Sequence, residues 1–220
     1  LRAGQDEEEM FRVLDAEGEY LKEPSTWSTR RVGDYVVKKY RLRKPWDRFR
    51  QLRDPQRFRR AWIVSSRLTE QDIDIPQFCA YLECRRFGFI HLTATVMRYI
   101  ENAVNVEQAA RELNETGNNE AIELFLQRIA DAVNKLEQAN AYHADLSGKN
   151  ILTVGPDYTR TIFIDLDSVH LDHAYGAPER LKNHIQLYDS FCDLWDDTIL
   201  AQFIERMTPA DIDLSPWQWR

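Results

Sequence analysis

Glycine, proline and cysteine are scarce in this chain. Its 220 residues include only 8 Gly, 8 Pro and 3 Cys, a composition that excludes collagen, long disordered tracts and repeat arrays. Cys79, Cys84 and Cys192 are odd in number and wrongly spaced for a zinc site, so we expect reduced thiols. The chain also lacks an apolar run of the ~18 residues that a membrane span needs. Residues 1–9 are acidic rather than arranged as a signal peptide, so we expect a cytoplasmic location.

The charge is divided unevenly along the sequence. The net charge is −7, yet residues 30–60 carry 13 Lys and Arg against 3 Asp, an excess of +10 that leaves −17 for the other residues. A basic block in an acidic protein predicts a docking surface for an anionic partner: nucleic acid, a phosphorylated sugar or the cytoplasmic leaflet of a membrane. The alternative is an Arg-rich helix face that only contacts water.

Hydrophobic periodicity predicts a first half rich in β-strands. Strand-like runs separated by turn residues cover 27–32, 35–40, 77–84 and 89–99. A helical pattern over 46–68 predicts one amphipathic helix, or two with a break at Asp54-Pro55. Residues 1–23 show only a weak helical pattern, and we expect them to form a frayed lead-in. This half should therefore form a mostly antiparallel sheet with one helix.

The pattern becomes helical after Glu101. Helical spacing covers 106–113, 122–136 and 187–207, and a hairpin is expected at 150–164. We therefore predict an α+β fold with two lobes: a β-rich N-terminal lobe over 1–96, a hinge over 97–101 and a mainly helical lobe over 102–220.

Two acidic motifs flank the predicted hairpin. His143-Ala144-Asp145-Leu146 precedes Asn150 with the spacing H-x-D-L-x-x-x-N, and an apolar run ends in Asp165, fifteen residues after Asn150. Phosphoryl transfer from a nucleotide needs such a set, because one carboxylate must face the acceptor hydroxyl while an amide and a second carboxylate hold Mg²⁺ on the phosphates. Hard oxygen atoms suit that ion. We therefore predict that Asp145 is catalytic and that Asn150, Asp165 and Asp167 hold metal.

Each of these residues also has an ordinary structural explanation. A lone histidine such as His143 is usually a packed, hydrogen-bonded side chain, and lone Asp or Asn residues often end strands or form turns. The functional interpretation rests on the combination, because helix, loop, hairpin and strand end follow one another in the order that the chemistry requires.

A nucleotide site also requires a cation for the α- and β-phosphates. Val36-Val37-Lys38-Lys39 resembles the V-A-I-K strand that carries it, with Lys38 in the register of the motif. Lys39, on the other face of the strand, is the competing candidate. The run from Met97 through Tyr99 to Glu101 is the candidate interlobe segment whose backbone groups would bind adenine.

Together these motifs resemble the protein-kinase-like superfamily, and within it the bacterial lipopolysaccharide core kinases, which phosphorylate heptose or 3-deoxy-octulosonic acid. The similarity spans residues 35–168 and includes the Val-Val-Lys-Lys-Tyr strand and the Asp-Leu-Asp form of the metal motif. It implies a two-lobed kinase fold, ATP and Mg²⁺ as cofactors, Lys149 at the γ-phosphate and an anionic glycolipid acceptor. It also implies contact with the inner-membrane surface through the Arg-rich segment 41–60, and no nucleic-acid partner. The oligomeric state stays open.

The sequence departs from the superfamily pattern in several places. No Gly-rich phosphate loop is present, Ala61 stands where the first helix should carry a Glu, and Lys149 lies two residues beyond the expected lysine position. Ala177-Pro178-Glu179 matches the A-P-E element of protein kinases only by its letters. Three alternatives therefore stay open: a protein or small-molecule kinase such as an antibiotic phosphotransferase, a catalytically dead kinase-fold binding module and, last, a metal-dependent phosphohydrolase.

Overall fold

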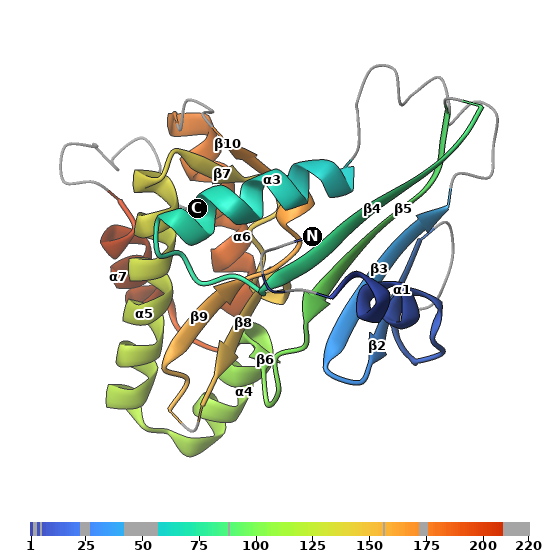
Figure 1. Cartoon of the computed structure of the whole chain (residues 1–220). Helices are drawn as coiled ribbons and strands as arrows, with labels where there is room; N and C mark the ends of the chain where they lie inside the picture. Colours follow the sequence, from blue (N-terminus) through green and yellow to red (C-terminus); the bar gives the residue numbers. More distant parts are fainter. Residues whose placement is uncertain are drawn as a thin grey trace. The chain divides into compact units, whose positions relative to one another are not determined.

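The computed structural model of the chain divides into two compact units (Figure 1). The first contains Leu1–Arg67 and Pro76–Glu101, and the second contains Leu68–Ile75 and Asn102–Arg220. The structure describes residues 1, 4, 6–22, 27–41, 57–87, 89–155, 157–171 and 176–208.

The first unit is built on a five-stranded antiparallel sheet with the strand order β1-β2-β3-β5-β4. Four of the strands occupy the predicted runs, and their bounds are β2 (Trp27–Val32), β3 (Tyr35–Arg41), β4 (Phe78–Arg86) and β5 (Phe89–Arg98). Gly33 adopts a φ of 55° in the turn between β2 and β3, a backbone conformation that glycine reaches without strain. The sequence patterns therefore predicted this hairpin and its partner strands correctly.

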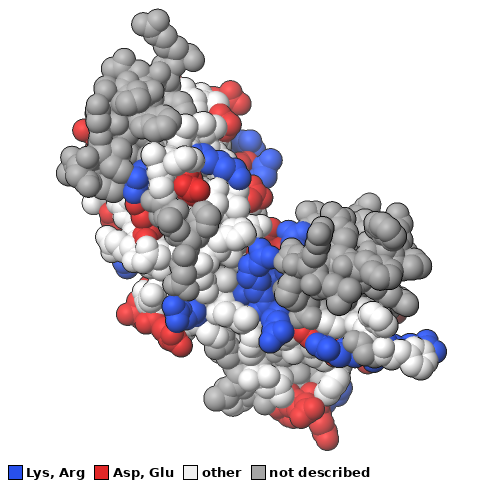
Figure 2. Space-filling view, turned by 90° about the horizontal axis from the view of Figure 1, so that it is seen from above, with Lys and Arg blue, Asp and Glu red and all other residues white. Residues whose placement is uncertain are grey.

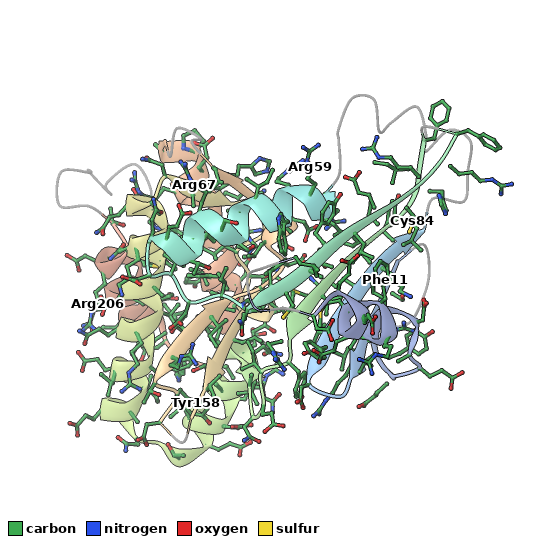
Figure 3. The ribbon with its side chains drawn as sticks, viewed as in Figure 1. Phe11, Arg59, Arg67, Cys84, Tyr158 and Arg206 are labelled. Carbon is green, nitrogen blue, oxygen red and sulfur yellow. The ribbon has the colours of Figure 1, made fainter. Side chains whose placement is uncertain are left out.

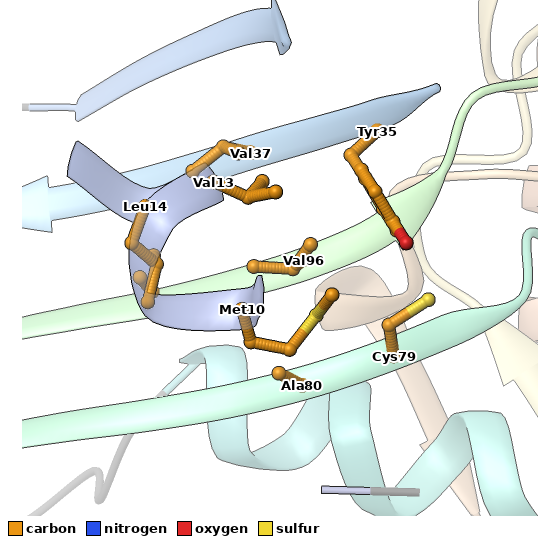
Figure 4. Close-up of a cluster of buried hydrophobic side chains, with 9 residues drawn as sticks. Met10, Val13, Leu14, Tyr35, Val37, Cys79, Ala80 and Val96 are labelled. Atoms are coloured by element: carbon orange, nitrogen blue, oxygen red, sulfur yellow. The ribbon is translucent and has the colours of Figure 1, made fainter. Parts of the chain in front are cut away.

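The beginning of the chain is ordered, so the expectation of a frayed lead-in is wrong. Residues Glu7–Asp15 form helix α1, and Glu19–Lys22 form β1 at the sheet edge. The Asp6 carboxylate accepts a hydrogen bond of 3.0 Å from the backbone N–H of Glu8, which caps the helix start. Met10, Val13 and Leu14 of α1 pack onto the sheet in one core cluster (Figure 4). Three apolar residues are enough to keep helix α1 ordered because the sheet supplies apolar side chains for them to pack against.

Helix α3 (Arg57–Glu70) falls within and just beyond the predicted helical region. Its Phe58 ring meets Tyr40 of β3 edge-on with centroids 6.4 Å apart, and Trp62 meets Phe78 of β4 at 6.5 Å. These contacts fix the N-terminal half of α3 to the sheet of the first unit. Residues 42–56, which contain most of the Arg-rich segment 41–60 and the predicted break at Asp54-Pro55, lie outside the described residues.

The second unit combines four helices with two small sheets in the part of the chain that is described. The helices are α4 (Val106–Thr116), α5 (Asn119–Gln138), α6 (Ala177–Phe191) and α7 (Asp197–Arg206). The sheets are β6 (Val104–Asn105) with β8 (Ile151–Val154) and β9 (Arg160–Phe163), and β7 (Ala141–His143) with β10 (Val169–Leu171). The α+β fold class is thereby confirmed.

The helical tail predicted over 187–207 is two helices rather than one. Helix α6 ends at Phe191, and α7 starts anew after Asp196, whose carboxylate accepts hydrogen bonds of 2.8 and 3.1 Å from the N–H groups of Thr198 and Ile199. The two helices share an aromatic core in which Phe125, Trp195 and Phe203 surround Phe191 edge-on or tilted. None of the helices in the described ranges is both long and apolar enough to cross a membrane.

Candidate active site

His143, at the end of β7, links the two acidic motifs. Its ring is fully buried; Nε2 donates to the Ile164 carbonyl at 3.0 Å, and Nδ1 accepts from the backbone N–H of Asp145 at 3.3 Å. Burial lowers the pKa of this imidazole from its ordinary value. A neutral ring with one donor and one acceptor is the form that makes both bonds. His143 is therefore a structural residue that holds the loop after β7 against the end of β9.

The loop after β7 closes through an Asp–Asn pair. Nδ2 of Asn150 donates to the backbone carbonyl of Asp145 at 2.8 Å and to its Oδ2 at 2.9 Å. The Asp145 side chain itself is exposed, so a hydroxyl group can approach it. Because both hydrogens of the Asn150 amide serve Asp145, the remaining polar atom of the amide is Oδ1, an acceptor.

Helix α6 supports the same loop from a direction that the sequence did not reveal. Gln186 accepts from the backbone N–H of Leu146 at 3.0 Å, and its Nε2 lies 3.4 Å from Oδ1 of Asp145. One turn further on, Oγ of Ser190 accepts from the N–H of Gly148 at 2.9 Å. The two polar residues are four apart and share one helix face. This four-residue spacing was the only sequence signal for the two supporting side chains. It was not specific, because polar side chains on one face of a helix usually indicate that the face is exposed to solvent.

Gly148 allows α4 and α6 to approach the loop closely. A Cβ atom at this position would lie 2.7 Å from Cγ of Glu107 on α4 and 3.1 Å from Cβ of Ser190 on α6. Both distances are shorter than ordinary contacts, so a larger residue would force the loop or these two side chains to shift. Lys149, the next residue, is exposed, in keeping with a predicted role at a phosphate.

Asp165 follows β9 with an unusual backbone. Its φ of 61° and ψ of 42° are left-handed, a conformation that costs a non-glycine residue on the order of 1 kcal/mol. The surrounding hydrogen bonds hold it there: the N–H of Ile164 donates to the Asn150 carbonyl at 2.9 Å, and the N–H of Ser168 donates to the Asp165 carbonyl at 3.0 Å. Asp167, in the following 3-10 turn, is only 5% exposed.

Three residues of the site suit a magnesium ion by their chemistry. Asn150 offers an amide oxygen, and Asp165 and Asp167 offer carboxylates, which are the hard oxygen ligands that Mg²⁺ prefers. No cluster of three or more His, Cys, Asp or Glu side chains with the arrangement of a metal site occurs among the described residues. The fit of Asn150, Asp165 and Asp167 to the ion therefore rests on their oxygen atoms alone, and these metal ligands stay a prediction.

Lys38 and Lys39 are separated by the two faces of β3. Lys39 shares the face of Tyr35 and Val37, where it donates to the Leu14 carbonyl and lies 3.8 Å from Oδ1 of Asp15 at the end of α1. A cation at the C-terminal end of a helix is stabilised by the helix dipole. Lys38 projects from the opposite face. Lys39 thus has a structural role, which favours Lys38 as the phosphate ligand; that role stays a prediction.

The segment from Met97 to Glu101 begins with the last two residues of β5 and continues beyond the strand. Met97 is buried and pairs with Val36 of β3. The backbone N–H of Tyr99 donates to the Asp34 carbonyl at 2.8 Å, and its ring lies 3.8 Å from the Arg31 guanidinium. Glu101 is exposed and lies 4.0 Å from the same Arg31. The Tyr99 N–H is therefore engaged within its own unit, and adenine binding by this segment stays a prediction.

Comparison with known sequences decides the family. The sequence model of the lipopolysaccharide kinase (Kdo/WaaP) family matches residues 12–215, which is nearly the whole chain. The chain belongs to this family. It is therefore a kinase, a phosphotransferase of lipopolysaccharide biosynthesis, and the resemblance noted in the sequence is confirmed. No curated protein matches the chain.

Two solved structures share the fold. A structure of WaaP in complex with acyl carrier protein matches with a TM-score of 0.69 and 21% sequence identity, covering 94% of this chain and 85% of that chain. A structure of the bifunctional kinase-methyltransferase WbdD matches with a TM-score of 0.54 and 15% identity, covering 88% of this chain and 44% of that chain. At these identities the matches show the kinase fold, as predicted.

The contacts of Gln186 predict that this side chain positions Asp145. We expect Gln186→Leu to lower the rate of phosphate transfer about 10- to 100-fold, because the loop loses one side-chain and one backbone anchor. Nucleotide affinity should change by less than about twofold, since the loop and not the phosphate cation is disturbed. Steady-state kinetics and nucleotide titration measure both. The same change at the exposed Gln202 of α7 is the control, and a wild-type rate in Gln186→Leu would refute the positioning role.

The buried ring of His143 predicts a loss of stability in acid. Because its pKa is depressed in the folded state, the unfolded chain binds more protons below about pH 6.5, and the free energy of unfolding should fall with falling pH. His143→Gln, which can donate and accept without titrating, should flatten this slope. Urea denaturation between pH 7 and 5 measures it, with His170→Gln, an exposed histidine, as the control. Equal slopes in all three proteins would show that folding does not lower the pKa of His143.

Proposed function

We propose that this kinase transfers the γ-phosphate of ATP to a sugar hydroxyl of the lipopolysaccharide inner core. Membership of the Kdo/WaaP family supports the substrate class. The observation that carries the reaction is the exposed Asp145 carboxylate, held by side-chain amides of Asn150 at 2.9 Å and Gln186 at 3.4 Å. A carboxylate fixed in this way and open to solvent can orient an incoming hydroxyl group.

Each residue of the site has a role in the proposed reaction. Asp145 accepts a hydrogen bond from the acceptor hydroxyl and then its proton as the oxygen attacks the γ-phosphorus, while the bond from that phosphorus to the β-phosphate breaks and ADP leaves. Asn150, Asp165 and Asp167 would hold Mg²⁺, which would neutralise the negative charge of the phosphates. Lys38 binds the α- and β-phosphates, and the exposed Lys149 reaches the γ-phosphate. His143 stays neutral and keeps the loops that carry Asp145 and Asp165 together.

The distribution of charge supports the proposed acceptor and location. We propose that the anionic glycolipid meets the kinase at the cytoplasmic face of the inner membrane, with the Arg-rich segment 41–60 facing the phosphates and head groups. Of this segment the structure describes Arg41, at the end of β3, and residues 57–60, which begin α3. On the face drawn in Figure 2, Lys and Arg form one patch near the middle and lie beside Asp and Glu elsewhere.

Substitution of the two acids should separate transfer from binding. We expect Asp145→Asn to lower phosphate transfer at least ~10³-fold with nearly unchanged nucleotide binding, because the proton acceptor is lost and the metal ligands remain. Asp165→Asn should also lose Mg²⁺-dependent nucleotide binding. Labelled-ATP transfer to purified core glycolipid measures the first effect, and thermal shift with Mg²⁺ and ATP measures the second.

The exposed Asp157 provides the control, since Asp157→Asn changes the same charge far along the hairpin from either motif. Wild-type transfer by Asp145→Asn would refute the catalytic role. Transfer to a protein or an aminoglycoside but not to core glycolipid would keep the kinase and refute the proposed acceptor.

The two neighbouring lysines of β3 form a matched pair. We expect Lys38→Met to weaken ATP binding about tenfold or more, since a charge-assisted contact to phosphate is lost. Lys39→Met should leave ATP binding unchanged but lower the free energy of unfolding by about 1 kcal/mol, because the C-terminal end of α1 loses its cation. Calorimetric titration and urea denaturation measure the two effects. The reverse outcome would assign the phosphate to Lys39.

A further inference from the structure

The turn between β4 and β5 exposes two aromatic side chains. Arg86 pairs with Phe89 across the end of the hairpin, so a two-residue turn connects the strands. Phe87 is 87% exposed and Phe89 is 48% exposed. The strands run on past Cys84 to this turn (Figure 3). Large apolar side chains gathered at one turn are uncommon on a surface that only meets water.

The backbone conformation at Phe87 indicates that this phenylalanine does not stabilise the hairpin turn. Phe87 has a φ of 51°, which favours Gly or Asn at the first position of a two-residue hairpin turn and strains a bulky residue. The Arg86 guanidinium lies 5.4 Å from the centroid of the Phe87 ring, an exposed contact of small energy. Folding thus gains little from the Phe87 ring, and an interaction outside the unit would explain it.

The charge at the turn has one sign. Arg85 and Arg86 precede Phe87, and the sequence contains no Asp or Glu between Cys84 and Ile100. Glu83 pairs with Arg85 at 2.7 Å, while the Arg86 side chain is exposed. At the same end of the sheet, Arg41 of β3 pairs with Leu92 of β5, so the chain enters the Arg-rich segment 41–60 from there. The tip therefore combines aromatic rings with cations.

We propose that the tip of the β4–β5 hairpin, residues Arg85–Phe89, contacts the surface of an anionic lipid bilayer. Phe87 and Phe89 enter the boundary between head groups and acyl chains, where aromatic rings are favoured, and Arg86 binds lipid phosphates. A bilayer suits this tip because a convex turn can insert among lipids that rearrange around it, and because basic residues add attraction to an anionic leaflet. Arg85 stays paired with Glu83, and this ion pair lies outside the bilayer.

The contact differs from the docking of the glycolipid acceptor. It involves the lipid matrix rather than the acceptor's sugar, and it lies on a hairpin that contributes none of the proposed catalytic or metal-binding residues. It therefore holds whether or not the proposed acceptor is correct. The Arg-rich segment 41–60 would add charge attraction, while the hairpin tip supplies the apolar part of the binding.

Vesicle co-sedimentation of the full chain tests the proposal. The vesicles contain phosphatidylcholine with about one third phosphatidylglycerol and no glycolipid. We expect the double variant F87N/F89T to bind about tenfold more weakly than wild type, because two rings no longer leave water. Asn tolerates the positive φ and Thr suits a strand, so both substitutions are compatible with the hairpin. Phe11→Gln, at an aromatic residue of α1 that is 52% exposed, is the matched control and should bind as wild type.

Three outcomes would overturn the proposal. Equal binding by wild type and F87N/F89T would leave the segment 41–60 as the whole membrane contact. Binding only when core glycolipid is added to the vesicles would show recognition of the acceptor rather than of the bilayer. Self-association of wild type without lipid, lost in the double variant, would show that the tip meets a second copy of the chain; analytical ultracentrifugation detects it. Thermal unfolding of each variant confirms that the comparison is between folded proteins.

Discussion

The buried imidazole of His143 is the interaction on which the catalytic loops depend. One ring nitrogen donates to the residue before Asp165, and the other accepts from the backbone of Asp145, so a single side chain sets the spacing of two segments that are twenty residues apart. Burial keeps the ring neutral, and only the neutral ring can serve both partners. Pairing of β7 with β10, in which His143 lies opposite Val169, places the ring correctly.

Around the His143 ring, the second unit holds the loops by hydrogen bonds to their backbone N–H groups. The Asn150 carbonyl binds Ile164, the Ser168 carbonyl binds Ala144, and α6 provides Gln186 and Ser190 for two further N–H groups. Several independent hydrogen bonds can hold the left-handed Asp165, which would otherwise relax to an ordinary conformation. The left-handed Asp165 and the hydrogen bonds around it thus form one connected network.

The sequence predicted the parts of the fold whose signals are local. Hydrophobic periodicity predicts the strands of the central sheet and helix α5. The spacing of Asp145, Asn150 and Asp165 indicates their chemistry from the sequence alone. For residues 1–23 only a weak helical pattern was predicted and not the ordered helix α1, because its apolar stripe has only three buried residues and its stability comes from a sheet distant in sequence. Gln186 was missed for the same reason: its partners are forty residues away, and a polar residue on a helix carries no sign of them.

The connection from β10 to α6 is short. Strand β10 ends at Leu171 and α6 begins at Ala177, so only five residues separate the segment that carries Asp165 from the helix that supports Asp145. Protein kinases place a phosphorylation-dependent regulatory loop in the corresponding interval. In this chain only nine residues lie between Asp167 and the start of α6 at Ala177, so the segment that carries the predicted metal ligands and the helix that supports Asp145 are tied closely along the chain.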